Sequence, residues 1–280
     1  MQVHLQIGSR RVWADLGKPI SIGIRQSFGP DQVNHFGVDV ASRQPIRSSG
    51  FVGSTSQGGS CNVDQISIIP HCNGTHIEHV GHIVDKALDA TLSHVPPLMP
   101  AALITVQPIE AKLSGAESYR PPLSPTDCVI PASSLRRAAE KISLEHSGAD
   151  ALIVRTLPND DRKLHFRYGV DLDPPFFTIE ALNWILDHGF EHLLVDFPSL
   201  DRMHDDGLLT NHHLFWNVPE QTHQLAVDSR VQRSITEMVF VPTEVPDGHY
   251  LLNLQFPDWA TDATPARPLL FAIQEHEHNK

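Results

Sequence analysis

The segment from Pro70 to His82 holds the densest group of side chains that could bind a metal ion or move protons. It reads Pro-His-Cys-Asn-Gly-Thr-His-Ile-Glu-His-Val-Gly-His, with four histidines, one cysteine and one glutamate. Neutral imidazoles and carboxylates are the usual protein ligands of zinc, and they also suit manganese and iron. The Asn73-Gly74 turn signal excludes one uninterrupted helix. We therefore expect a bent segment that presents a divalent metal site.

The spacing within this segment supports a shared site without requiring one. His76, Glu78 and His82 are separated by even numbers of residues, so an extended backbone would turn them to the same face. His71 lies beyond the Asn-Gly turn and can fold back toward that face, whereas His79 should point away from it. The opposing interpretation is a polar loop in a chain with 18 histidines. No fixed motif such as His-Glu-x-x-His is present, so spacing alone leaves both interpretations open.

Two further groups of polar residues could reach a site. Asp196, Ser199 and Asp201 follow an expected strand at 192–197, and binding groups collect at the carboxyl ends of strands in parallel α/β sheets. Turn and capping chemistry explains these three residues equally well. The adjacent His212 and His213 could be a ligand and its support, or one of them could be a core histidine.

Four aromatic residues are candidates for stacking on a substrate ring. Packing in the core is the favoured interpretation for each, because large aromatic side chains dominate cores as readily as pockets. They are Phe36, Phe215, Trp216 and Phe256.

The elements that must position these residues are mostly short strands. Apolar patterning between turn signals predicts strands at 3–7, 12–14, 20–24, 36–40, 66–69, 101–106, 151–156, 192–197, 237–242, 249–256 and 269–273. Helical spacing predicts one helix over 135–144 and another over 180–188, with Thr178 as its N-cap and Gly189 after its end. No repeat or sharp boundary divides the chain, so we expect a single domain over residues 1–280.

Composition narrows the classes of partner. The chain has 280 residues, 40% hydrophobic and 19% charged, with a formal net charge of −12. That charge repels phosphate backbones and anionic lipids, so neither nucleic acid nor a membrane surface is expected as a partner. Its three cysteines fit a reducing compartment better than a disulfide framework. With no secretory signal or membrane span in the sequence, we expect a cytoplasmic protein.

Residues 71–82 resemble the signature of the cyclase family of metal-dependent hydrolases, whose members include kynurenine formamidase and isatin hydrolase. The signature His-x-Gly-Thr-His-x-Asp-x-Pro-x-His is matched at Gly74-Thr75-His76 and at His82, whereas Glu78 stands in place of Asp. An extra residue separates the first histidine from Gly-Thr-His, so either His71 or Cys72 takes the first ligand place. His71 is favoured, because it keeps an imidazole and a turn or bulge can absorb the inserted residue. Similar segments lie at 15–20, 151–156, 180–201, 212–215, 235–237 and 264–268.

The resemblance implies a fold and a set of site residues. The fold would be α/β, of the swivelling β/β/α type with a β-barrel-like core. The cofactor would be a divalent metal, zinc in the first place and manganese as the alternative. One ion would be held by His71, His76 and Glu78, and a second or weaker one by Glu78, His212 and Glu237. His82 would act as general base and acid, its alternative role being to orient a ligand.

The resemblance also implies an activity. The protein would be an arylformamidase-like hydrolase that uses metal-activated water on an amide, a lactam or a related carbonyl C–N or C–O bond of a small molecule. Members of the family are usually homodimers or larger, so a homodimer or homotetramer is expected. Two alternatives stay open: a metal-dependent isomerase or dehydratase, and a metal-binding protein without turnover.

Overall fold

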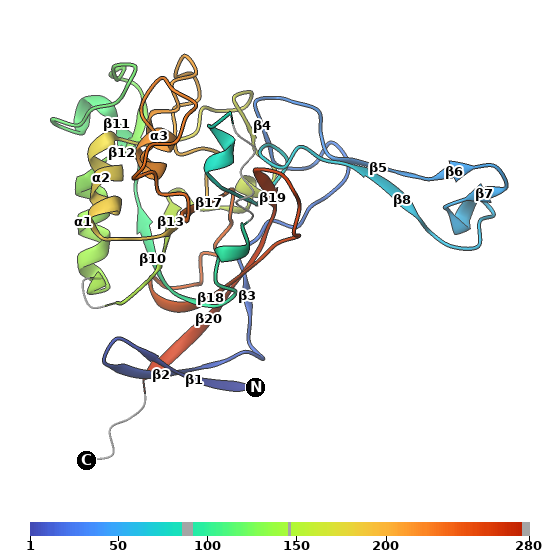
Figure 1. Ribbon diagram of the computed structural model, residues 1–280, viewed down its shortest axis with the longest axis horizontal. Coiled ribbons are helices and arrows are strands. Elements are labelled where there is room, and N and C mark those ends of the chain that lie inside the picture. The colour runs from blue at the N-terminus through green and yellow to red at the C-terminus, as the bar shows by residue number, and fades with distance from the viewer. Residues whose placement is uncertain (86–91, 145–146, 276–280) are drawn as a thin grey trace.

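A computed structural model describes residues 1–85, 92–144 and 147–275 of the chain. A large mixed sheet forms the centre of the main body, helices lie beside one end of it, and a long two-stranded arm projects from the opposite end (Figure 1). A hairpin of the first two strands lies below the body, next to the last strand. No helix within the described residues is both long enough and apolar enough to cross a membrane.

The described strands and helices have the following bounds. The strands are β1 Gln2–Ile7, β2 Arg10–Asp15, β3 Ile20–Ser21, β4 Asn34–His35, β5 Ser42–Pro45, β6 Arg47–Ser48, β7 Phe51–Val52, β8 Asp64–Ser67, β9 His76–Glu78, β10 Met99–Val106, β11 Ile109–Glu110, β12 Cys128–Ile130, β13 Ala151–Thr156, β14 Arg167–Tyr168, β15 Phe176–Phe177, β16 His192–Val195, β17 Ser234–Glu237, β18 Gly248–Gln255, β19 Ala263–Pro265 and β20 Arg267–Glu275. The α-helices are α1 Ala132–Lys141, α2 Ile179–Asp187 and α3 Thr210–Trp216, and short 3₁₀ turns include η2 Val80–His82.

Four parallel strands form the middle of the main sheet. They run in the order β10-β13-β16-β17, and antiparallel strands extend the sheet on both sides. Beyond β10 come β18, β20, β2 and β1, while beyond β17 come β9 and β19. The short strand β9 therefore lies between β17 and β19, at the edge of the sheet remote from the N-terminal hairpin.

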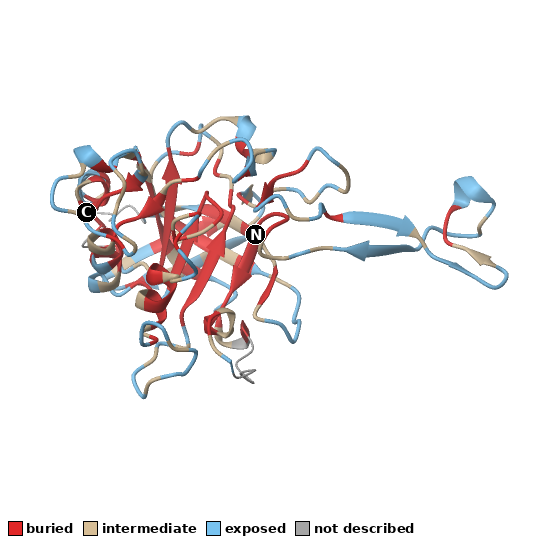
Figure 2. Ribbon diagram, turned by 90° about the horizontal axis from the view of Figure 1, so that it is seen from above, coloured by how far each residue is buried: buried red, intermediate tan, exposed pale blue. Residues whose placement is uncertain are grey.

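The core consists of two apolar clusters, one on each face of the central strands. Successive residues of β10 alternate between them: Ala102 and Ile104 join the cluster under the helices, whereas Leu103 joins the cluster on the other face. Alternation of this kind follows from the two-residue period of a strand. Because both faces are covered, β13, β16 and β17 are buried at every residue and β10 at most of its residues (Figure 2).

The projecting arm is a separate structural feature. Its strands β5 and β8 pair only with each other among the described strands, as do β6 and β7 near its tip. Most of the arm is exposed, in contrast to the buried strands of the main body (Figure 2). Ile66 of β8 leaves 56% of its surface exposed.

Several sequence-based predictions agree with these elements. The strand at 151–156 is β13, and the helix expected over 180–188 is α2, with the Thr178 hydroxyl accepting a hydrogen bond from the amide of Ala181 at 3.2 Å. The strand expected at 36–40 is wrong, since Phe36 and Gly37 form a turn with positive φ. The strand expected at 237–242 lies earlier, at 234–237. The mixed α/β class is confirmed, whereas the described strands show no closed barrel.

Acid should weaken the fold through His192 at the start of β16. This side chain is 4% exposed, and its Nδ1 lies 2.8 Å from the Ser234 hydroxyl. Burial, and to a smaller extent the positive charge of His94, lowers the pKa of His192 to about 4. The unfolded chain takes up this proton with a pKa of about 6.5, so stability should fall as the pH drops from about 6.5 to 4. The loss from this residue should be on the order of 1–3 kcal/mol.

Urea unfolding of wild type and His192→Gln across this pH range measures the effect. The variant should lose less stability than wild type on acidification, while His204→Gln, which changes an exposed histidine, should match wild type. Equal acid dependence in wild type and His192→Gln would contradict this assignment.

Candidate metal centre

The short strand β9 places two ligand-type side chains on one side of the sheet edge. His76 and Glu78 are two residues apart, so they share a face, and both are buried. On one flank Glu237, at the end of β17, is directly opposite His76 in the antiparallel register. His76 Nε2 and Glu237 Oε2 lie 3.4 Å apart. The register of the β9–β17 pair thus brings a histidine and two carboxylates together.

Gly74 and Thr75 orient His76 toward this cluster. The Thr75 hydroxyl accepts a hydrogen bond from the Ile24 amide at 2.8 Å and donates one to the Met238 carbonyl at 2.5 Å, which ties the segment to the residues after β17. His76 Nδ1 donates to the Gly74 carbonyl at 2.9 Å. This bond leaves the lone pair of His76 on Nε2, the atom that faces Glu237. Burial lowers the pKa of His76 to about 4, so the ring is neutral near pH 7 and able to bind a cation.

His212 of α3 completes the buried part of the cluster. Its Nε2 lies 3.0 Å from Glu78 Oε1, and its Nδ1 lies 2.5 Å from Asp201 Oδ2. Asp201 is held in turn by the Tyr119 hydroxyl at 2.7 Å and by the Asn211 amide at 2.6 Å. A carboxylate behind a histidine fixes the orientation of the ring and raises its basicity. Despite burial, hydrogen bonds to Asp201 and Glu78 hold the pKa of His212 well above its usual range.

The second oxygen of Glu78 faces a different set of groups. Glu78 Oε2 lies 3.5 Å from His71 Nε2 and 4.0 Å from His82 Nδ1. The rings of His71 and His82 stack with their centroids 4.4 Å apart. The side chains of His71 and His82 are 26% and 28% exposed, whereas that of Glu78 is 1% exposed. Glu78 therefore separates a buried group of ligand atoms from a group that opens to solvent.

The hydrogen bonding of the cluster fits a divalent cation. Three buried ligand-type atoms have no hydrogen-bond partner in the part of the chain that the structure describes: His71 Nε2, His76 Nε2 and Glu78 Oε2. Leaving such atoms unpaired costs on the order of 1–3 kcal/mol each, and coordination to bound cations would offset this cost. The donor set of imidazoles and carboxylates suits zinc, manganese or iron. Three overlapping groups here have ligand atoms close enough to hold an ion: His76–Glu78–Glu237, Glu78–His82–His212 and His71–His82–Asp262.

The grouping differs from the expected one in one respect. The five ligands that the family resemblance implies lie together with His82 in one cluster. They are His71, His76, Glu78, His212 and Glu237. However, His76 groups with Glu237 on the buried side of Glu78, while His71 groups with His82 on the open side. No ion-sized group among the described residues therefore contains all three members of the expected trio of His71, His76 and Glu78.

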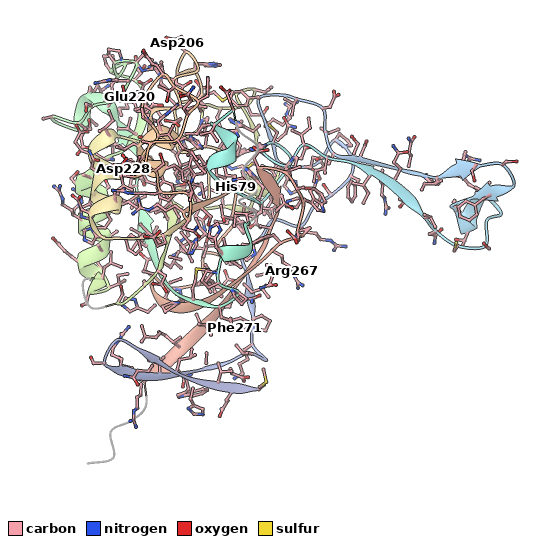
Figure 3. All side chains as sticks on the ribbon, viewed as in Figure 1. His79, Asp206, Glu220, Asp228, Arg267 and Phe271 are labelled. Atoms are coloured by element: carbon pink, nitrogen blue, oxygen red, sulfur yellow. The ribbon has the colours of Figure 1, made fainter. Side chains whose placement is uncertain are left out.

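The structure also distinguishes between the alternative residues at two of the expected ligand positions, His71 or Cys72 at one and His212 or His213 at the other. His71 lies in the cluster, whereas Cys72 is in none of its ion-sized groups among the described residues, and burial raises the pKa of the Cys72 thiol to about 11. His213 Nδ1 instead lies 3.2 Å from the Val218 carbonyl. His79 also points away, because its Nδ1 accepts a hydrogen bond from the Gly81 amide at 3.0 Å. Figure 3 shows His79 in the middle of the main body.

The residues after β16 divide into two roles. Asp201 supports His212, as described above. Asp196 is buried against Lys163, whose Nζ donates to its Oδ2 at 2.6 Å, and Ser199 accepts a hydrogen bond from the Asp201 amide at 3.1 Å. Turn chemistry thus accounts for Ser199, whereas Asp196 has a structural role of another kind, as the buried partner of Lys163.

The four aromatic residues considered for stacking on a substrate differ in how far they are buried. Phe215 and Trp216 are fully buried in the core under the helices, as expected. Phe256 packs partly buried against the other core cluster. For Phe36 the expectation of core packing is wrong, since it is 56% exposed.

Two residues near the cluster were missed by the sequence analysis. Asp262 lies in the loop before β19, and its Oδ2 is 2.9 Å from His71 Nε2 and 3.3 Å from His82 Nδ1. His35 is 3% exposed, and neither of its ring nitrogens has a hydrogen-bond partner within the described residues. Burial first, and then the positive charge of His76, lowers the pKa of His35 to about 3. No spacing in the sequence links either residue to residues 71–82.

Comparison with known proteins gives a family match and structural neighbours. The family model described as "Putative cyclase" matches residues 14–202. A search of curated proteins gives no match. Isatin hydrolase A from Labrenzia aggregata superposes with a TM-score of 0.58 at 15% identity, covering 91% of this chain and 93% of that one. A protein described as a predicted metal-dependent hydrolase from Bacillus stearothermophilus superposes with a TM-score of 0.55 at 16% identity, covering 91% of this chain and 98% of that one. At these identities the likeness is one of fold.

Metal binding should release protons, and metal affinity should therefore rise with pH. Burial and the charge of Glu78 raise the pKa of Glu237 to about 8, and the pKa of His212 is also raised. Both groups hold a proton in the metal-free protein near pH 7, and both must lose it to become ligands. Each released proton makes the apparent affinity rise about tenfold per pH unit, so we expect a ten- to hundredfold rise per unit between pH 6 and 8.

Calorimetric titration with Zn²⁺ or Mn²⁺ at several pH values measures this slope. The slope should decrease by one proton in Glu237→Gln. An affinity that does not change with pH would contradict the proposed protonation of the cluster.

Loss of the carboxylate behind His212 should weaken metal binding without removing a ligand. We expect Asp201→Asn to bind the metal about 10- to 100-fold more weakly, because His212 loses its charged support. Competition with a chromophoric chelator measures the affinity. Tyr119→Phe removes a hydrogen bond to the other oxygen of Asp201 and serves as the control, with an affinity within a few-fold of wild type. Equal affinity in Asp201→Asn and wild type would rule out the supporting role.

Proposed function

This chain belongs to the cyclase family, and on that basis we propose that it is a divalent-metal-dependent hydrolase that opens the C–N bond of an amide or lactam with water. Two solved structures with a similar fold are named isatin hydrolases, which supports this chemistry over others. Arylformamidase-like action on an N-formyl aromatic amine is the finer form of the proposal. The substrate would be a small molecule, and the homodimer or homotetramer expected from the family resemblance is part of the same proposal.

The observation that carries the proposal is the set of unpartnered ligand atoms around Glu78. His76 Nε2 and Glu78 Oε2 are buried without a hydrogen-bond partner in the described structure, and His71 Nε2 lies 3.5 Å from the latter. In a polar cluster with a structural role alone, such atoms would be hydrogen-bonded to one another, because an unpaired buried polar group destabilises the fold. Atoms left free in this way are what a bound cation requires.

The ligand roles follow from the two sides of Glu78. On the buried side, His76, Glu78 and Glu237 would hold one ion, and His212, whose Nε2 lies 3.0 Å from Glu78 Oε1 and 3.8 Å from Glu237 Oε1, would be a further ligand. On the open side, His71 would bind an ion with Glu78 Oε2. A bound divalent ion lowers the pKa of water to near neutral and polarises a carbonyl oxygen. The remaining chemistry falls to the protein's own side chains.

His82 is the group best placed to move protons. It lies at the open side of the cluster on the 3₁₀ turn η2, and its Nδ1 donates to Asp262 Oδ2 at 3.3 Å. This bond leaves Nε2 free to take a proton from the attacking water and to give it to the departing nitrogen. The substrate should enter from this side, because His71, His82 and Asp262 are the partly exposed members of the cluster.

Two measurements on the purified protein test the proposal. Elemental analysis should find a divalent metal, and removal of that metal by a chelator should abolish turnover. A screen of N-formyl aromatic amines, lactams and lactones, followed by mass spectrometry, should find either a ring-opened product heavier by one water from a lactam or lactone, or the free amine together with formate from an N-formyl amine. A product of unchanged mass would identify an isomerase instead, and a product lighter by one water a dehydratase. Bound metal without turnover of any of these substrates would contradict the hydrolase proposal.

Replacement of His82 should separate catalysis from metal binding. We expect His82→Ala to lower kcat/KM by about 10²- to 10⁴-fold, the usual contribution of a general acid–base group. Its metal content should equal that of wild type. His79→Asn is the neighbouring control: it keeps an acceptor for the Gly81 amide and should retain turnover. Full activity in His82→Ala would refute the role given to this histidine.

A further inference from the structure

The loop before β19 places the carboxylate of Asp262 beside the 3₁₀ turn η2, which carries His82. The backbone holds this carboxylate in position from both sides. The Asp262 carbonyl accepts a hydrogen bond from the His79 amide at 3.1 Å, and the next residue, Ala263, is paired with Glu78 of β9. Asp262 is thus fixed next to His82, although 180 residues separate the two in the sequence.

A glycine in η2 makes this close approach possible. A Cβ at Gly81 would lie 3.3 Å from the Cβ of Asp262 and 2.5 Å from Cε1 of the His79 ring. Cβ contacts this short are rare, so a side chain at position 81 would push away the Asp262 loop or the His79 ring. The residue before His82 therefore leaves room for the carboxylate to reach the imidazole.

Two imidazoles lie next to the Asp262 carboxylate, and of these only the His82 ring has hydrogen-bond geometry. His82 Nδ1 lies 3.3 Å from Asp262 Oδ2 in a hydrogen bond. His71 Nε2 lies closer to the same oxygen, at 2.9 Å, but has no hydrogen-bond partner among the described residues. An ionised carboxylate can only accept, so His82 must carry its proton on Nδ1. His71 is also a proposed metal ligand, and a nitrogen that binds a cation has no proton to donate.

Asp262 is better placed than Glu78 to hold the proton of His82 on Nδ1. Glu78 Oε2 lies 4.0 Å from this nitrogen, beyond hydrogen-bond distance. Without Asp262 the ring could carry its proton on either nitrogen, and a neutral ring protonated on Nε2 cannot accept a proton there. A carboxylate that fixes the tautomer and the orientation of a general base does so without being protonated itself.

We propose that Asp262 is the positioning residue for proton transfer: its carboxylate holds the proton of His82 on Nδ1 and so keeps Nε2 free to accept one. The proposal rests on the proposed function in taking His82 as the proton-transfer group. The proton that Nε2 takes from water passes to the departing nitrogen, and the proton on Nδ1 stays in place throughout. Asp262 acts only through the His82 ring.

A competing arrangement gives Asp262 a different role. Ligand-type atoms of His71, His82 and Asp262 are close enough together to hold an ion. An ion bound there would replace the proton on Nδ1 of His82. The two arrangements therefore differ at one atom, since Nδ1 carries a proton if Asp262 positions the ring and a metal ion if the three residues form a binding site.

Turnover gives one test of the positioning role. With a lactam or an N-formyl aromatic amine that wild type hydrolyses, Asp262→Asn should lower kcat about 10- to 100-fold, as for loss of a carboxylate behind a functional histidine. KM should stay within a few-fold of wild type. The same substitution in the His82→Ala background should cause no further loss, because Asp262 acts through that ring. An equal loss of kcat in both backgrounds would overturn the proposal.

Nitrogen-15 NMR of the histidine rings tests the proposal without a substrate. Long-range ¹H–¹⁵N spectra distinguish protonated, unprotonated and metal-bound ring nitrogens. The Zn²⁺-loaded protein suits this measurement because Zn²⁺ is diamagnetic, and the signals of His82 are those missing from His82→Ala. At about pH 8.5, above the ordinary pKa of histidine, wild type should show a proton on Nδ1 of His82 and none on Nε2. Asp258→Asn, which changes an exposed residue of the same loop, should match wild type.

Asp262→Asn should move the proton of His82 to Nε2, because the amide can donate a hydrogen bond to Nδ1. Asp262→Ala is a second variant without the carboxylate, should Asp262→Asn fail to fold by circular dichroism, and it should also lose the preference for Nδ1. If the protein binds no Zn²⁺, the same comparison is made on the metal-free protein.

Three outcomes would overturn the proposal: a proton on Nε2 of His82 in wild type, a metal ion on its Nδ1, or the same His82 spectrum in wild type and Asp262→Asn. The readout does not depend on turnover. A change of tautomer in Asp262→Asn supports the positioning role even where no substrate is hydrolysed. Hydrolysis by a protein whose His82 spectrum is unchanged in Asp262→Asn refutes that role and leaves the hydrolase proposal standing.

Discussion

The buried carboxylate of Glu78 is the constraint around which this structure is organised. An ionised carboxylate that is 1% exposed must be compensated, because removing it from water costs far more than the net stability of a domain can absorb. Here the compensation is divided. His212 faces one oxygen, and His71 and His82 face the other. The pKa of Glu78 is held below its usual range despite burial, and the neighbouring Glu237 carries the proton instead.

Sheet register, more than any loop, places the groups that surround this carboxylate. The strand β9 lies between β17 and β19, so Glu237 comes from one side and Asp262 from the other. The parallel strands beside them are buried on both faces and form the rigid part of the molecule. His212 enters from α3, held by Asp201 in the loop that follows β16. Residues far apart in the chain thus meet at one edge of a single sheet.

The sequence predicts the local part of this arrangement better than the distant part. His76 and Glu78 share a face because they are two residues apart on a strand, and that follows from spacing alone. The inclusion of His212 and Glu237 came from family resemblance, since no periodicity connects them with residues 71–82. Asp262 was not found, because its place depends on the pairing of two three-residue strands, which are too short to give a sequence signal. Phe36 is a separate case. The apolar residues near it suggest a strand, but Phe36 lies in a turn, and its ring is exposed.

A crystal structure of the Mn²⁺-soaked protein, with an anomalous difference map, tests the central claim most directly. The account predicts an anomalous peak on the buried side of Glu78, within bonding distance of His76 Nε2, His212 Nε2 and the carboxylate of Glu237. A map without a peak there, in which these imidazoles and carboxylates are hydrogen-bonded to one another and leave no space for an ion, would contradict it.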